Sequence, residues 1–224
     1  MLVSALEGHQ RWAPHYDSRP NPLLSLEMRV LSDLLPPIAG QCFLDVACGT
    51  GRWMTYLRQR GADVFGVDVC AEMLAEAQRK PLARGRSAVG DATRLPFPSG
   101  AADTVLCSFA VGYLADLQSA IAEMARAARP GARVIISDLH PEGVSNGWTR
   151  SFRLGTDVFE MEHFGPSLEQ LRAAGQAGGL KLHTHIESCF GEPERPHFRS
   201  AGKEHVYFSL TGVPAVWVGI WTKS

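Results

Sequence analysis

The sequence has 224 residues, of which 45% are hydrophobic and 20% are charged, and its formal net charge is −1. These proportions exclude a disordered chain, because disorder combines low hydrophobicity with a high net charge. The balance of 22 basic against 23 acidic residues offers no basic surface that would gather a nucleic acid. We therefore expect one folded domain over residues 1–224 and no nucleic-acid partner.

The start of the chain and its cysteines indicate a reduced, aqueous environment. The first ten residues lack the basic stretch and apolar run of a secretory signal, and no run of about 18 apolar residues could cross a bilayer. The five cysteines form no C-x-x-C pair, so neither a zinc site nor a disulfide framework is expected. We therefore expect a cytoplasmic protein with no membrane partner and no metal site.

The chain begins with a helical segment and continues with strands that alternate with helices. Residues 1–40 are interrupted by prolines and contain an amphipathic stretch over 23–35, which indicates a helical cap. The pattern then predicts strands at 42–46, 64–67, 87–89, 104–109 and 133–137, and helices at 53–60, 71–78 and 117–129. This order predicts an α/β fold with a doubly wound, mostly parallel sheet and helices on both faces.

After Asp138 the pattern changes. Residues 139–164 look irregular, 167–177 look helical, and apolar runs at 180–187 and 215–221 look like strands that close the sheet as a hairpin-like edge. Residues 188–202 are rich in Pro, Gly and charge, which predicts a loop. We divide the domain into a cap (1–40), a cofactor-binding core (41–138) and an acceptor-side insertion with the last strands (139–224).

A glycine-containing loop, Asp45-Val-Ala-Cys-Gly-Thr-Gly51, follows the first predicted strand and opens a helix. Such a turn lets a ligand touch the backbone. Asp68 ends the next strand, where an acid can accept the hydroxyls of a ribose. A dinucleotide fingerprint needs a further glycine at the position of Met54, and Asp45 would repel a pyrophosphate. A ligand with an ammonium and a sulfonium suits Asp45, and S-adenosylmethionine is such a ligand.

A third acid, Asp91, follows the third predicted strand in Gly90-Asp91-Ala92 and could accept the amine of an adenine. Any one of the three acids could instead cap a helix or lie in a solvated turn. Together they lie at the carboxyl ends of adjacent strands, which is where open α/β sheets bind ligands. The three acids together therefore favour a binding site for S-adenosylmethionine.

These motifs resemble those of the class I S-adenosylmethionine-dependent methyltransferases, in the branch of the ubiquinone and menaquinone biosynthesis C-methyltransferases. The resemblance runs over 12–223 and rests on the glycine loop, Val67-Asp68, the segment from Gly90 to Phe97, Arg129-Pro130-Gly131 and the closing segment 212–217. It implies a Rossmann-like, seven-stranded sheet whose last strand is antiparallel. Ala47 stands where the family usually has glycine, and alanine is small enough to be tolerated there if its φ is negative.

The resemblance also implies roles for individual residues. Gly49, Gly51 and the backbone of Ala47 would face the methionine part of the cofactor, and Asp45 would bind its amino group, with the carbonyl of Ser108 in reach. Asp68 would bind the ribose and Asp91 with Ala92 the adenine, while Val69 and Met73 pack on the adenine ring. Tyr16 either closes over the cofactor from the cap or only anchors the cap.

Methyl transfer from a sulfonium needs alignment of donor and acceptor more than it needs catalytic side chains. A base helps where the acceptor is a hydroxyl, a phenol or an acidic carbon, and histidine suits that task. His140, just after the strand at 133–137, and His163, in the acceptor-side insertion, are the candidate catalytic residues. Either could instead be a surface or supporting residue.

Two other functions stay open. The fold could serve a nucleic-acid or protein methyltransferase, although Ser108-Phe109-Ala110-Val111 lacks the Pro-Pro-aromatic motif of enzymes that methylate base amino groups. The fold could also serve a binding subunit that transfers nothing. The sequence favours methylation of a small molecule at oxygen, nitrogen or carbon by a monomer or homodimer, and it leaves the acceptor undetermined.

Overall fold

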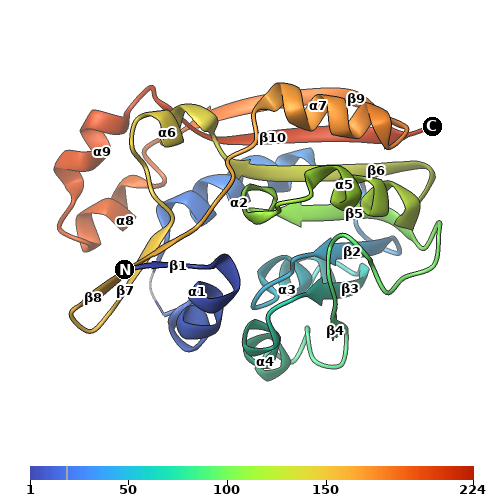
Figure 1. Ribbon diagram of the computed structural model, residues 1–224, viewed down its shortest axis with the longest axis horizontal. Coiled ribbons are helices and arrows are strands. Elements are labelled where there is room, and N and C mark those ends of the chain that lie inside the picture. Colours follow the sequence, from blue (N-terminus) through green and yellow to red (C-terminus); the bar gives the residue numbers. More distant parts are fainter. Residues whose placement is uncertain (19) are drawn as a thin grey trace.

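A seven-stranded sheet forms the centre of the computed structural model, which describes residues 1–18 and 20–224 (Figure 1). Within these residues the strand order is β4-β3-β2-β5-β6-β10-β9. The strands are β2 (Cys42–Val46), β3 (Asp63–Asp68), β4 (Ser87–Val89), β5 (Ala102–Ser108), β6 (Ala128–Leu139), β9 (Leu180–Cys189) and β10 (Pro214–Lys223). The chain order reverses between β2 and β5, so the carboxyl ends of these two strands form the crevice in which such sheets bind ligands.

Strand directions match the sequence prediction. The pairs β2–β3, β3–β4, β2–β5 and β5–β6 are parallel, whereas β10 is antiparallel to both β6 and β9. The central strands are covered on both faces, and Val105, Leu106 and Cys107 of β5 are fully buried in succession. The doubly wound, mostly parallel sheet with an antiparallel last strand is therefore confirmed.

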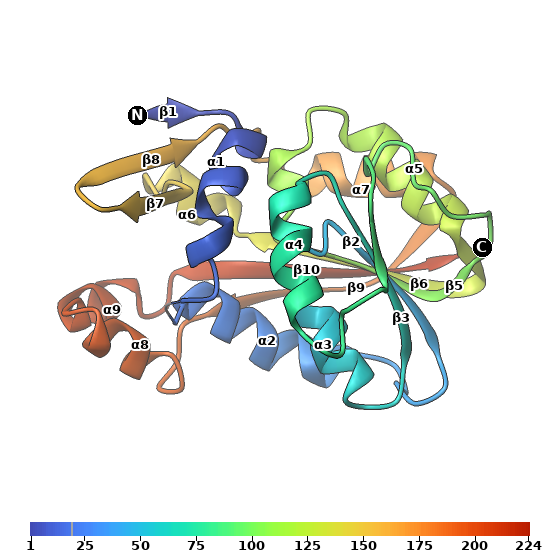
Figure 2. The same ribbon diagram turned by 90° about the horizontal axis from the view of Figure 1, so that it is seen from below.

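Helices cover both faces of the sheet (Figure 2). They include α2 (Pro22–Leu34), α3 (Arg52–Arg58), α4 (Ala71–Arg79), α5 (Leu117–Ala127) and α7 (Leu168–Ala177). Ile121 of α5 and Leu171 of α7 belong to one buried core, and Leu26 of α2 and Trp53 of α3 belong to the core on the other face. No helix in the described part of the chain combines the length and the apolar content needed to cross a bilayer.

The N-terminal segment forms a cap over the ligand-binding edge. It contains β1 (Leu2–Val3), α1 (Ala5–Trp12) and the 3-10 helix η1 (Ala13–His15). Both α1 and η1 contact α4, while β1 pairs in parallel with β8 (Asp157–Met161) in a second sheet of order β1-β8-β7. The cap is thus joined to both the core and the acceptor-side insertion.

The acceptor-side insertion is more regular than the sequence indicates. The stretch expected to be irregular contains α6 (Pro141–Ser145) and an antiparallel hairpin of β7 (Ser151–Leu154) with β8. Two residues connect the hairpin strands, and the first of them, Gly155, has a φ of 58°. A two-residue turn that begins with glycine is a hairpin signal, so the expectation of irregular structure is wrong.

The predicted loop over 188–202 is also partly wrong. The chain there forms α8 (Arg195–Ser200), followed by α9 (Glu204–Leu210). Pro196 lies in the first turn of α8, where proline is tolerated because its missing N–H would have no partner in the helix. Phe198 packs edge-on against Phe190 at 5.0 Å between ring centroids. Proline and charge therefore mark a helix start rather than a loop.

Candidate cofactor and acceptor sites

The loop after β2 has a left-handed backbone at three positions. The φ angles are 57° at Ala47, 54° at Gly49 and 75° at Gly51, the last residue before α3. The condition of a negative φ at Ala47 is therefore not met. The turn from strand to helix imposes this conformation, although an alanine there carries a steric cost that glycine does not.

Asp68 ties two ligand-facing loops together. Its Oδ2 accepts a hydrogen bond from the backbone N–H of Gly49 at 2.8 Å, and its Oδ1 accepts one from the N–H of Cys70 at 2.8 Å. Burial raises the pKa of the carboxyl, while these backbone N–H groups oppose the rise. Each oxygen keeps a second lone pair, so Asp68 can still accept a hydroxyl.

Two buried polar atoms, Oδ2 of Asp45 and Nη1 of Arg52, have no partner among the described residues. Both side chains line one cavity together with Gly49 and Tyr16. Burial raises the pKa of Asp45 to about 8, and Arg52 opposes the rise. Unpaired buried groups are costly, so this cavity is suited to a ligand that carries both an ammonium and a carboxylate.

Arg52 was missed by the sequence reasoning, although it directly follows Gly51. Its Nη2 donates to Oε2 of Glu27 at 2.8 Å and to Oγ of Ser108 at 3.0 Å. Glu27 is fully buried in α2 and also accepts hydrogen bonds from Ser108 and Ser137. This network fixes one side of the Arg52 guanidinium and leaves Nη1 for a ligand.

The structure brings almost all of the predicted cofactor residues together. Three adjoining cavities at the carboxyl edge of the sheet share Ala47 and are lined by the predicted residues Tyr16, Asp45, Ala47, Gly49, Asp68, Val69, Met73, Asp91, Ala92 and Ser108. Gly51 does not line them, and a Cβ at Gly51 would lie 3.1 Å from the Cβ of Ala83. We call these three cavities the cofactor cleft.

Asp91 and Tyr16 lie at different depths of the cofactor cleft. Asp91 is exposed, and its Oδ1 accepts from the N–H and the hydroxyl of Thr93, each at 2.8 Å. Tyr16 packs against Trp12 at 4.6 Å between ring centroids, and burial raises the pKa of its hydroxyl to about 12. Tyr16 is therefore a neutral donor at physiological pH.

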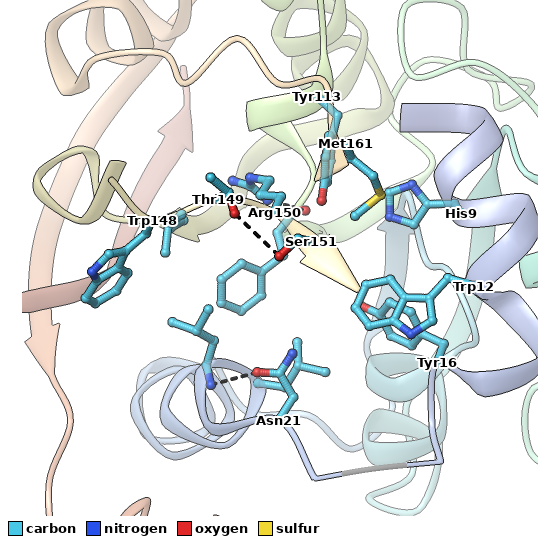
Figure 3. A pocket seen from close by; sticks show the side chains of 14 residues that line it. His9, Trp12, Tyr16, Asn21, Tyr113, Trp148, Thr149, Arg150, Ser151 and Met161 are labelled. Carbon is cyan, nitrogen blue, oxygen red and sulfur yellow. Dashed lines mark hydrogen bonds between the residues drawn. The ribbon is translucent and has the colours of Figure 1, made fainter. Parts of the chain in front are cut away.

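A further cavity adjoins the cofactor cleft under the cap and the acceptor-side insertion (Figure 3). Aromatic and apolar side chains dominate its walls, which are formed by His9, Trp12, Tyr16, Asn21, Leu23, Leu24, Phe109, Tyr113, Leu139, Trp148, Thr149, Arg150, Ser151 and Met161. Five residues, His9, Tyr16, Leu24, Phe109 and Tyr113, also line the cofactor cleft. We call this second space the acceptor cavity.

The charged side chain that lines the acceptor cavity, Arg150, forms a buried ion pair. Arg150 donates to Asp138 at the end of β6, and its guanidinium lies 4.5 Å from the ring centroid of Tyr113 in the 3-10 helix η2 (Val111–Tyr113). The second oxygen of Asp138 accepts from the N–H of Gly112 at 2.7 Å. Nε of Arg150 is buried without a partner among the described residues. The sequence reasoning missed Arg150.

The two histidines proposed from the sequence lie elsewhere. His140 is buried and caps α6: its Nδ1 accepts from the N–H of Glu142 at 3.1 Å, and its Nε2 lies 3.5 Å from Glu187 of β9. His163 follows β8, with Nδ1 3.4 Å from the carbonyl oxygen of Met161. Neither is among the residues that line the cofactor cleft or the acceptor cavity.

The histidines of β9 do not form a metal centre with their neighbours. Nε2 of His185 lies 3.7 Å from Oε1 of Glu187, which His140 also approaches. Over residues 1–18 and 20–224, no group of three or more His, Cys, Asp or Glu side chains is arranged to hold a metal ion.

Comparison with known proteins agrees with this geometry. A family model described as "Methyltransferase domain" matches residues 44–136. The demethylmenaquinone methyltransferase of Deinococcus radiodurans is 34% identical over 184 residues, which are 79% of this chain and 73% of the relative. The enzyme of the same name from Thermus thermophilus is 40% identical over 139 residues, which are 58% of this chain and 63% of that relative.

Among solved structures, an S-adenosylmethionine-dependent methyltransferase from Mesorhizobium loti has the same fold. The TM-score is 0.69 at 18% identity, and the match covers 91% of this chain and all of the other. The chain belongs to the class I S-adenosylmethionine-dependent methyltransferases. Within that class it falls in the branch that resembles the menaquinone and ubiquinone biosynthesis methyltransferases, and S-adenosylmethionine is its cofactor.

Proposed function

We propose that this chain transfers the methyl group of S-adenosylmethionine to a small, planar aromatic acceptor that carries a hydroxyl group. One observation carries the proposal: an apolar, aromatic-walled cavity adjoins a cleft that contains both an unpaired carboxylate oxygen and an unpaired guanidinium nitrogen. The first space suits a planar acceptor, and the second suits the amino-acid end of the cofactor.

The residues of the cofactor cleft fit S-adenosylmethionine. In this proposal Asp45 binds the ammonium group and Arg52 the carboxylate, because each has a buried atom without a protein partner. Asp68 binds the ribose, and Asp91 with Ala92 binds the adenine edge, with Val69 and Met73 on the adenine ring. Ala47 and Gly49 present backbone, Ser108 its carbonyl, and Tyr16 covers the methionine part. The bound sulfonium supplies an already activated methyl group.

The acceptor cavity supports an aromatic substrate over a charged one. Trp12, Phe109, Tyr113 and Trp148 offer faces on which a planar ring can stack, and the guanidinium of Arg150 is already paired with Asp138. The names of the two relatives point to a naphthoquinone-type acceptor. We propose that a reduced, hydroxylated ring of this kind receives the methyl group on carbon or oxygen.

Transfer then depends mainly on alignment. The acceptor lies against the wall that the acceptor cavity shares with the cofactor cleft, so that its nucleophilic atom faces the methyl group in line with the leaving sulfur. Closure of the cap over this wall excludes water. Neither His140 nor His163 has a role in this proposal.

Calorimetry and label transfer test the proposal. Titration with S-adenosylmethionine, S-adenosylhomocysteine and NAD should show binding of the first two only. Enzyme with methyl-labelled cofactor should then label 2-prenyl-1,4-naphthoquinol, kept reduced with dithionite, or a catechol, in preference to aniline or a malonyl thioester. Binding of NAD alone would refute the cofactor assignment, and label only on aniline or the thioester would refute the acceptor class.

A further inference from the structure

We propose that His9, in the cap helix α1, is the general base that takes a proton from the acceptor during methyl transfer. The inference rests on the function proposed above. His9 lies where the acceptor cavity and the cofactor cleft meet, and it lines both of them (Figure 3). A base at this junction is within reach of an acceptor atom that faces the methyl group.

The hydrogen bond of one ring nitrogen fixes the tautomer of His9. Nδ1 lies 2.7 Å from the carbonyl oxygen of Ala5, one helical turn earlier. A carbonyl oxygen can only accept, so the proton of the neutral ring is on Nδ1. Nε2 then carries a lone pair and forms no hydrogen bond with another residue in the part of the chain described. This is the form that can accept a proton.

The surroundings of His9 keep the ring neutral. Burial lowers its pKa below the ordinary 6.5, and Arg150 acts in the same direction, while the hydrogen bond to Ala5 and the carboxylate of Asp68 act against it. Tyr113 of η2 packs edge-on against the ring at 5.0 Å between centroids. At pH 7 the imidazole is therefore unprotonated at Nε2 and ready to act as a base.

The other residues at the junction cannot take this role. Of the five described residues that line both spaces, Leu24 and Phe109 have no titratable group. Burial raises the pKa of Tyr16 to about 12, and burial also raises that of Tyr113, so both hydroxyls keep their protons at neutral pH. Among these five residues, only His9 offers a basic lone pair.

The step balances with one base. The bond between hydrogen and the acceptor's oxygen, or its acidic carbon, breaks, and the proton goes to Nε2 of His9. The electron pair left on the acceptor forms the bond to the methyl carbon, while the bond from that carbon to sulfur breaks and its pair stays on sulfur. The products are the methylated acceptor, S-adenosylhomocysteine and a protonated His9, which then loses its proton to solvent.

Substitution by asparagine separates the base from the helix contact. In His9→Asn the side-chain amide can still donate to the carbonyl of Ala5, but it has no basic nitrogen. With 2-prenyl-1,4-naphthoquinol we expect kcat to fall by about 100-fold or more, the usual contribution of a general base, while calorimetry shows little change in cofactor affinity. The matched control is His15→Asn, because His15 is exposed in the same cap and lines neither space.

The pH profile gives a readout that a merely structural role would not move. At saturating cofactor, wild-type kcat should fall as the pH drops below 6.5 and through the lowered pKa of His9, since protonation removes the lone pair. This limb should disappear in His9→Asn, and added imidazole should restore part of the turnover of His9→Ala. Turnover of His9→Asn equal to that of His15→Asn would overturn the proposal.

Nuclear magnetic resonance tests the base without turnover. Nitrogen shifts of the imidazoles, assigned by comparison with His9→Asn, should show His9 protonated on Nδ1 and uncharged at pH 7. A proton on Nε2, or a charged ring, would overturn the role of His9 even if methyl transfer occurs. Cofactor binding with no transfer to any probe would instead refute the proposed acceptor, and the resonance result would still decide the state of His9.

Discussion

Buried carboxylates dominate the chemistry of single residues in this protein. Asp45 and Asp68 stand at the ends of neighbouring parallel strands, and burial raises the pKa of both. Their surroundings differ: Asp68 accepts two backbone hydrogen bonds, whereas Oδ2 of Asp45 has no partner in the described structure. The two acids should therefore respond to substitution in different ways.

For Asp45 we expect Asp45→Asn to stabilise the cofactor-free protein in a pH-dependent way. The folded pKa is raised to about 8, so the folded protein holds a proton that the unfolded chain releases above about pH 4. The contribution of the Asp45 carboxyl to the free energy of unfolding is fully present below about pH 4 and is lost as the pH rises to about 8. The gain in free energy of unfolding should grow by about 1.4 kcal/mol for each pH unit between about 4 and 8.

Thermal unfolding of the wild type and of Asp45→Asn between pH 4.5 and 8.5 measures this gain. Calorimetry at pH 8 should show that Asp45→Asn binds the cofactor more weakly than the wild type does. If Asp45→Asn is more stable but binds the cofactor less well, Asp45 serves ligand binding and not the stability of the fold. A gain that does not change with pH would contradict the raised pKa.

For Asp68 we expect Asp68→Ala to weaken binding of S-adenosylmethionine by at least about tenfold, the loss of a charge-assisted hydrogen bond. Because Gly49 and Cys70 also lose their acceptor, stability should fall by about 1–3 kcal/mol. Asp68→Asn keeps one acceptor oxygen and tests binding in a more stable background. Asp33→Ala, on an exposed position of α2, is the matched control for calorimetry. Unchanged affinity in both Asp68 variants would exclude a ribose contact.

Sequence was sufficient to predict most residues that line the cofactor cleft, because all of these except Tyr16 lie at fixed places on strand-loop-helix motifs. Asp45, Asp68 and Asp91 follow consecutive strands, so their meeting at one edge follows from a parallel sheet. His9 and Arg150 could not be found in this way, because neither lies near that motif and their meeting depends on how the cap and the acceptor-side insertion dock. The direction of the His140 side chain, into the start of α6, depends equally on tertiary packing.

Among the elements, the loop between β2 and α3 is built tightly enough to hold an alanine in a left-handed conformation. We expect Ala47→Gly to raise the free energy of unfolding by about 0.5–1 kcal/mol, because the steric cost it relieves exceeds the added freedom of the unfolded chain. Chemical denaturation measures the change. Ala122→Gly, on the exposed face of α5, should instead lose about 1 kcal/mol. A loss at both positions would argue against strain at Ala47.

Helices and strands were predicted well where a regular hydrophobic pattern extends over many residues, and poorly where local sequence signals conflict. The core strands of the sheet are continuous apolar runs, and they were all found. The hairpin β7–β8 is short and half exposed, and its two-residue turn was the only local signal. α8 begins with Arg195-Pro196, a pair that also suits a loop, and its burial depends on Phe190 and Tyr207 from other segments.

On the scale of the whole molecule, aromatic stacking joins the cap to the acceptor-side insertion. Trp12 stacks on Phe152 of β7 at 5.1 Å with an interplanar angle of 3°, and Phe152 stacks in turn on Phe159 of β8. Trp12 also packs against Tyr16. The cap and the hairpin are therefore expected to open together.

We expect Trp12→Ala to speed backbone hydrogen exchange in α1 and in β7–β8 to a similar extent, while β2, β5 and β6 stay protected. Exchange followed by mass spectrometry measures both regions at once. Phe208→Ala, which removes an aromatic ring that is 58% exposed on α9, is the control and should change neither region. Faster exchange in α1 alone would show that the cap opens by itself.

Pairing of Leu2 and Val3 with Glu160 and Met161 places residues from both ends of a long stretch of chain in one small sheet. Both segments also line the acceptor cavity, so together they shape the space for the acceptor proposed above. A library that varies only the hairpin would leave its hydrogen-bonded neighbour strand unchanged. Directed evolution toward bulkier rings should randomise positions in 2–12 and 148–161 jointly.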